Sequence, residues 1–209
     1  MVLHPEYPCL GARSVFNRDR ATIVTIEGLG TPEAGRQLQV ALAEFSRTVD
    51  LDDGFASLVA VFRDEGELAE PAFERLLWQQ LRQIHHADDQ EWDPAVSSDP
   101  QNPHFAFSAA GTAFFVVGLH PGASRIARRT PLPTLVFNFH EQFEQLRAGE
   151  QYVRMRDTIR RRDLALQGTL NPMVEDHGSR SEARQYAGRQ VPDSWEPPVT
   201  PGPSIRATS

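Results

Sequence analysis

The stretch Phe114–Arg129, FFVVGLHPGASRIARR, carries both a fold signal and a functional question. Its first six residues are apolar and rich in strand formers, which predicts a buried β-strand. The run ends at His120-Pro121, and arginines follow at positions 125, 128 and 129. An imidazole and three guanidinium groups are therefore expected near one end of this strand.

Working outward, the segments HFAFS and AFFVVGL flank Ala109–Gly111 and predict a β-hairpin. Helical periodicity and start signals predict three main helices: from Thr31 to about Val49, from Glu70 to about His86, and a long one from near Phe139 through RMRDTIRRRDLALQG. The predicted strands are residues 22–27, 55–62, 103–109, 113–119 and 134–138. The fold class expected is α+β, a mixed sheet packed against about three main helices.

The last part of the chain differs in composition from the rest. Residues 190–209 are rich in proline and predict an irregular tail, either docked or disordered. We therefore expect a single domain over residues 1–189, followed by this tail.

Composition narrows the function classes. The chain has 209 residues and a net charge of −7, which argues against non-specific nucleic-acid binding. No apolar run approaches the ~20 residues of a membrane span, and the N-terminus does not resemble a secretory signal, so a cytoplasmic protein is expected. Cys9 is the single cysteine. There is no lysine, so an anion site made by a side-chain cation is expected to use arginine.

Several enzyme classes lack their motifs. HExxH and CxxC patterns are absent, which argues against a zinc site. GLGTPEAG matches neither phosphate-binding loop pattern, and PGASR lacks the second glycine of a nucleophile elbow.

His120 and the arginines allow two interpretations. A haem needs an axial ligand for iron and cations for its two propionates, which one histidine beside Arg125, Arg128 and Arg129 would supply. Alternatively, His120 is a loop histidine whose ring donates a hydrogen bond to a backbone carbonyl, and the arginines lie on the solvated surface. His140 is likewise either a ligand or proton donor, or a residue at a helix start. Six phenylalanines would be haem pocket walls or ordinary core: Phe105, Phe107, Phe114, Phe115, Phe137 and Phe139.

Several long sequence motifs between Pro8 and about Arg189 resemble those of the YqcI/YcgG family, and they occur in the same order as in that family. The motifs are PCLGARS, WDPAVSSDP, FFVVGLHPGASRIARR, LVFNFHEQFEQLR, MRDTIRRRDLALQGTLNPM and SEARQYAGR. The family includes haem-dependent oxygenases that hydroxylate a guanidine nitrogen. The resemblance implies haem b, O2, an unidentified electron donor and a guanidine substrate such as arginine or an arginine-like metabolite.

On this resemblance we predict His120 as the axial iron ligand, with His140 and Cys9 as alternatives. The three arginines are the predicted propionate anchors. Glu141 and Glu144, beside His140, are predicted to bind the substrate guanidinium, and Asp93 is a further candidate. A monooxygenase is the favoured function; a haem-binding carrier or sensor without turnover is the alternative, and a small-molecule-binding protein without haem is a third possibility.

Overall fold

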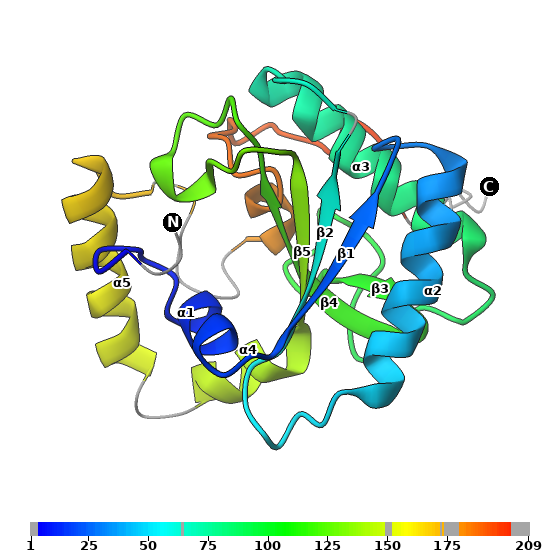
Figure 1. Ribbon diagram of the computed structural model, residues 1–209, viewed down its shortest axis with the longest axis horizontal. Coiled ribbons are helices and arrows are strands. Elements are labelled where there is room, and N and C mark those ends of the chain that lie inside the picture. The colour runs from blue at the N-terminus through cyan, green and yellow to red at the C-terminus, as the bar shows by residue number, and fades with distance from the viewer. Residues whose placement is uncertain (1–3, 64, 149–151, 172, 174–179, 202–209) are drawn as a thin grey trace.

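A five-stranded mixed β-sheet forms the centre of the protein (Figure 1). The computed structural model describes residues 4–63, 65–148, 152–171, 173 and 180–201. The strand order is β1-β2-β5-β4-β3; β1 pairs in parallel with β2, and the other neighbours are antiparallel. The strands are β1 (Ala21–Ile26), β2 (Ser57–Phe62), β3 (Phe107–Ala109), β4 (Thr112–Leu119) and β5 (Thr134–Phe139). The α+β fold class predicted from the sequence is confirmed.

One face of the sheet is covered by the two longest helices, α2 (Pro32–Thr48) and α3 (Glu70–Ala87). Both begin with the expected proline in the first turn, and Thr31 Oγ1 caps α2 by accepting a hydrogen bond from the Ala34 N–H. Their apolar stripes and the facing strand residues make the main hydrophobic core. Fully buried members of this core include Leu38, Leu42, Phe62, Phe73, Leu77, Trp78, Phe107, Phe114 and Phe137.

The opposite face of the sheet is surrounded by shorter elements. These are α1 (Leu10–Asn17), α4 (His140–Ala148), α5 (Tyr152–Gln167), and the 3-10 turns η1 (Ile126–Arg128) and η2 (Glu182–Gln185). Figure 1 shows α1, α4 and α5 on the side of the sheet away from α2 and α3. The helix expected from Phe139 onward is present as two helices; α4 ends at Ala148, directly before a glycine in the sequence, a residue that disfavours helix interiors.

The C-terminal segment, residues 180–201, docks on the sheet edge and on α3. Because β3 is only three residues long, it leaves the outer edge of β4 unpaired beyond Phe114. The Gly118 N–H there donates to the Tyr186 carbonyl, 2.7 Å away. Trp195 is 6% exposed, and its ring packs on Trp78. The tail predicted for residues 190–209 begins within this docked segment, and its residues 202–209 lie outside the described residues.

Glu74 of α3 anchors this segment. Its carboxylate accepts hydrogen bonds from Arg189 Nε, at 2.7 Å, and from Trp195 Nε1, at 2.9 Å. The Glu74 side chain is 5% exposed. We call Glu74, Arg189 and Trp195 the tail anchor. It fixes the C-terminal segment whose first turn, η2, reaches the other face of the sheet.

Candidate functional site

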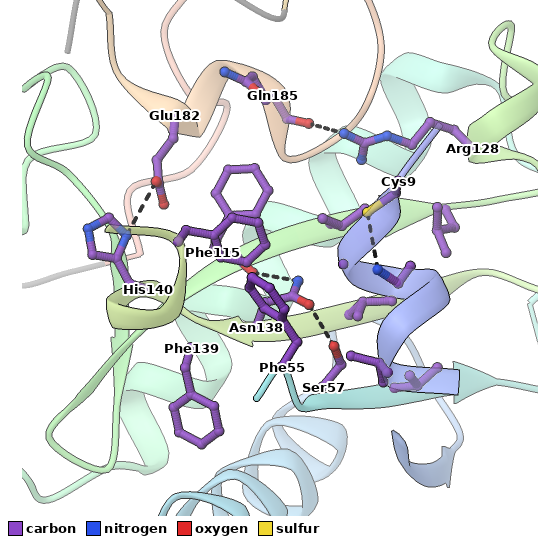
Figure 2. Close-up of a pocket in the computed structure, with 18 of the residues that line it drawn as sticks. Cys9, Phe55, Ser57, Phe115, Arg128, Asn138, Phe139, His140, Glu182 and Gln185 are labelled. Carbon is purple, nitrogen blue, oxygen red and sulfur yellow. Dashed lines mark hydrogen bonds and ion pairs between the residues drawn. The ribbon is translucent and has the colours of Figure 1, made fainter. Parts of the chain in front are cut away.

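A large cavity of about 1450 Å³ lies between the sheet and the shorter elements (Figure 2). Ligand pockets for drug-sized molecules usually measure roughly 300–1,000 Å³. Because side chains alternate between the two faces of a strand, three rows of paired side chains from β2, β5 and β4 point into this cavity and form its floor. The rows are Ser57–Asn138–Phe115, Val59–Val136–Val117 and Val61–Thr134–Leu119. The floor is therefore mostly apolar, and its polar groups lie at its two ends.

The polar row at one end of the floor is held rigidly. Ser57 Oγ donates to Asn138 Oδ1 at 2.7 Å, and Asn138 Nδ2 donates to the Phe115 carbonyl at 3.1 Å (Figure 2). Phe115 and Phe143 pack with ring centroids 5.4 Å apart, and Phe55 packs on Phe143. Next to this row, α4 begins with His140.

His140 faces the cavity and contacts two carboxylates. Its Nδ1 lies 3.4 Å from Glu182 Oε2, and its Nε2 lies 3.6 Å from Glu144 Oε1. The Glu182 side chain is 8% exposed, whereas that of Glu144 is 44% exposed. Glu182 Oε1 accepts a hydrogen bond from the Tyr186 hydroxyl at 2.7 Å. His140, Glu182 and Tyr186 thus form a mostly buried polar chain along one wall of the cavity.

Cys9 lies toward the other end of the cavity, at the N-cap of α1. Its Sγ accepts a hydrogen bond from the Ala12 N–H at 3.4 Å. Cys9 is exposed as a residue, and it lines the cavity. Desolvation by the surrounding protein raises the pKa of the thiol; the N–H groups of Ala12 and Gly11 and the Arg128 guanidinium act in the opposite direction. Burial thus favours the protonated thiol, whereas these three donors favour the thiolate.

The three predicted arginines have different surroundings. Arg128 lines the cavity, and its guanidinium donates to the carbonyls of Gly118, Tyr186 and Gln185 at 3.0–3.4 Å. No carboxylate among the described residues pairs with it, and burial lowers the pKa of its guanidinium. Arginine nevertheless stays protonated at neutral pH, so Arg128 places a positive charge in the cavity wall that no carboxylate of the described residues pairs with.

Arg125 and Arg129 are occupied elsewhere. Arg125 also borders the cavity, but its Nη2 lies 2.7 Å from both carboxylate oxygens of Asp163 on α5, and its side chain is 12% exposed. The Arg129 Nε donates to the Ala123 carbonyl at 2.7 Å, and Arg129 does not line the cavity. Among the described residues, Arg128 is thus the one of the three arginines that lines the cavity without a carboxylate partner.

His120 lies outside the cavity lining. Its ring is fully buried and stacks on Phe73 of α3, with centroids 4.3 Å apart. The Leu68 carbonyl and Glu70 favour the protonated ring, but burial has the larger effect and lowers the pKa of His120. Neither ring nitrogen has a hydrogen-bond partner of acceptable geometry among the described residues. The assignment of His120 as iron ligand stays a prediction; of its two alternatives, both His140 and Cys9 line the cavity.

The remaining predicted site residues lie as follows. Glu141 and Glu144 line the cavity from α4, and Glu141 Oε1 accepts a hydrogen bond from Gln145. Asp93 holds loop backbone, because its carboxylate accepts from the N–H groups of Ala95 and Ala113. Two of the six phenylalanines, Phe115 and Phe139, line the cavity, and the other four are buried outside its lining.

Sequence reasoning missed Glu182, Tyr186 and Asn138. Glu182 and Tyr186 lie within SEARQYAGR, and Asn138 lies within LVFNFHEQFEQLR, both of which carried the family resemblance. No spacing rule links residue 182 to residue 140, so the pattern held no sign that their side chains meet. For Asn138 a signal existed, because an amide within an otherwise apolar strand marks a position that needs hydrogen-bond partners.

The site is thus a large, mostly apolar cavity on one face of the sheet, with a buried carboxylate in its walls and a guanidinium that pairs with no carboxylate in the described part of the chain. The chain belongs to the YqcI/YcgG family, whose family model matches residues 1–200. It is 28% identical over 190 residues to "Uncharacterized protein YcgG" of Bacillus subtilis (strain 168). The aligned region covers 86% of this chain and 75% of that protein.

A second relative gives a shorter match. "Uncharacterized protein YqcI" of the same organism is 27% identical over 164 residues, or 75% of this chain; the chain thus spans 64% of that protein. No solved structure matches the chain significantly. In the part of the chain that the structure describes, no helix is long and apolar enough to cross a membrane.

Proposed function

We propose that this protein is a haem b-dependent monooxygenase that hydroxylates a guanidine nitrogen of arginine or an arginine-like metabolite. Membership of the YqcI/YcgG family, together with the resemblance of the sequence to the family's oxygenases, supports this reaction class. The cavity is the observation that carries the proposal. It has room for a large planar cofactor and a small substrate together, and an apolar floor of the kind that a porphyrin contacts.

The residues around the cavity fit a haem. A haem needs one axial side chain and cations near its propionates. Cys9 and His140 both face the cavity, and Arg128 offers a charge that no described carboxylate balances. We therefore favour Arg128 over Arg125 and Arg129 as propionate anchor, and we favour Cys9 or His140 over His120 as axial ligand. Bound haem would supply the activation of O2 with electrons from a separate donor.

The chain's own residues would bind, orient and shield the substrate. The three mostly apolar floor rows would keep water away from the reacting nitrogen, and a drier cavity would strengthen the electrostatic contacts within it. The amide of Asn138 cannot rotate, since Ser57 and the Phe115 carbonyl hold both its oxygen and its nitrogen. His140 Nδ1, 3.4 Å from Glu182, can hold or release a proton beside the substrate.

Overall, a guanidine N–H becomes N–OH. The second atom of O2 leaves as water, with two electrons and two protons supplied by the reductant and solvent.

An absorption spectrum of the purified protein after expression with haem supply is the first test. A Soret band supports the proposal, and a preparation that stays colourless when hemin is added overturns it. Turnover comes next: arginine, O2 and a reductant should yield a product heavier by one oxygen, labelled when 18O2 is used. Haem binding without any such product favours the carrier or sensor function instead.

Three variants decide the axial ligand. We expect Cys9→Ala or His140→Ala to lose haem or change its spectrum, and His120→Ala to retain the wild-type spectrum. The ferrous–CO spectrum distinguishes thiolate from imidazole ligation in the wild type. Loss of haem in His120→Ala alone, with the fold retained, would restore His120 as the ligand.

A further inference from the structure

Glu182 is a buried carboxylate in the cavity wall, and the structure places no arginine of the described residues beside it as an ion-pair partner. Its side chain is 8% exposed, and its partners are the Tyr186 hydroxyl at 2.7 Å and His140 Nδ1 at 3.4 Å. The two arginines nearest in sequence, Arg180 and Arg184, both lie within ion-pair distance of Asp193.

The position of this carboxylate is fixed by the surrounding structure. Ser181 caps η2 by accepting a hydrogen bond from the Ala183 N–H. Tyr186 is fully buried, stacks on Trp78 and accepts a hydrogen bond from the Phe107 N–H at 3.1 Å. Burial and the neighbouring carboxylate raise the pKa of Tyr186, so its hydroxyl stays protonated and donates to Glu182. The second oxygen of Glu182, Oε2, faces His140 at the cavity wall (Figure 2).

A buried negative charge is costly unless a cation or several donors compensate it. An imidazole is charged only when protonated, so His140 provides no permanent compensation. The other cavity-lining glutamates differ in this respect: Glu141 is exposed and Glu144 is 44% exposed, so water already solvates them. A cationic ligand gains more from Glu182, because ion pairs are stronger where water is excluded.

We propose that Glu182 is the substrate-binding carboxylate, and that the group it binds is a planar organic cation of the guanidinium type. A guanidinium carries several N–H donors in one plane, which suits a fixed carboxylate better than a compact ammonium does. This inference rests on the proposed function for the identity of the cation. It transfers the role predicted for Glu141 and Glu144 to a residue of the C-terminal segment.

Isothermal titration calorimetry with L-arginine and L-citrulline tests this assignment. Citrulline has nearly the same shape but carries a neutral urea in place of the guanidinium. We expect the wild type to bind arginine more tightly than citrulline. Glu182→Gln should weaken arginine binding at least tenfold, which corresponds to about 1.4 kcal/mol, and leave citrulline binding unchanged.

Glu144→Gln is the matched control. It removes a carboxylate that also contacts His140 but is largely solvated, so arginine binding should change by less than about fivefold, as for an exposed ion pair. If Glu182→Gln fails to fold, Glu182→Asp takes its place. It keeps the charge but withdraws the carboxylate by one methylene, and it should also weaken arginine binding at least tenfold.

The outcomes separate this inference from the proposed function. Equal arginine affinity of wild type and Glu182→Gln, or a larger loss in Glu144→Gln, overturns the role of Glu182 even when both proteins carry haem. A wild type that binds none of arginine, agmatine and methylguanidine also overturns it. Conversely, a protein that binds no haem but loses arginine binding in Glu182→Gln refutes the oxygenase and keeps Glu182 as the cation site.

Discussion

Removing the carboxylate of the tail anchor should destabilise the whole protein. Glu74→Ala leaves the Arg189 guanidinium without its carboxylate and Trp195 Nε1 without its acceptor. Breaking a buried ion pair by deleting one partner costs roughly 3–5 kcal/mol. Arg189 is 23% exposed and regains some hydration, so we expect about 3 kcal/mol, at the lower end of that range.

Urea-induced unfolding, followed by far-UV circular dichroism, measures this loss. With a slope of about 2 kcal/mol/M, a loss of about 3 kcal/mol lowers the unfolding midpoint by about 1.5 M. Glu74→Gln retains an acceptor for Trp195 and should lose less. Glu44→Ala serves as the control, because Glu44 pairs with Arg47 on an exposed helix face and its loss should cost under about 0.5 kcal/mol. A midpoint for Glu74→Ala within about 0.5 M of the wild type would refute the view that this anchor holds the C-terminal segment in place.

Three further perturbations test other parts of the structure. Gly118→Ala should lower stability by roughly 1–3 kcal/mol in thermal unfolding, because a Cβ would lie 2.7 Å from Leu77 Cδ1; a wild-type Tm would contradict this packing. Burial depresses the pKa of His120, so the unfolded chain binds a proton that the folded one does not, and stability should fall as the pH drops below about 6.5. His120→Leu should flatten that part of the pH profile, and an unchanged slope would argue against the buried neutral imidazole. Asp163→Asn should cost roughly 3 kcal/mol and speed amide hydrogen exchange in α5, since Arg125 loses its carboxylate; unaltered exchange would show that this pair does not hold the helix.

Much of the fold was predictable because periodicity and start signals are local. The predicted strand at 113–119 became Thr112–Leu119, and the predicted helix from Glu70 ends at Ala87. The predicted strand at 103–109 is shorter, because the Phe105 N–H closes a turn onto the Asn102 carbonyl before β3 begins at Phe107. Local patterns do not contain the strand order, which depends on contacts between distant segments.

The alternation of side chains along β4 and β5 decides on which face of the sheet His120 and His140 lie. Residues 115, 117 and 119 of β4 face the cavity, so the next residue, His120, turns toward Phe73 on the helix side. In β5 the parity is reversed: residues 134, 136 and 138 face the cavity, and His140 follows on the same side. Because both faces of these strands are apolar, the sequence alone does not reveal whether the odd-numbered or the even-numbered residues of each strand face the cavity.

The docked C-terminal segment also sets the order in which the site is assembled. A ribosome releases residues 181–201 only after all five strands, so a nascent chain can form the sheet while one wall of the cavity is still missing. At that stage the cavity floor is more accessible to a bulky, flat molecule than it is after the C-terminal segment has docked. For the haem that we propose, loading during synthesis would make haem supply in the growing culture more effective than hemin added to purified protein. A comparison of pigment yields by the two routes would measure this difference.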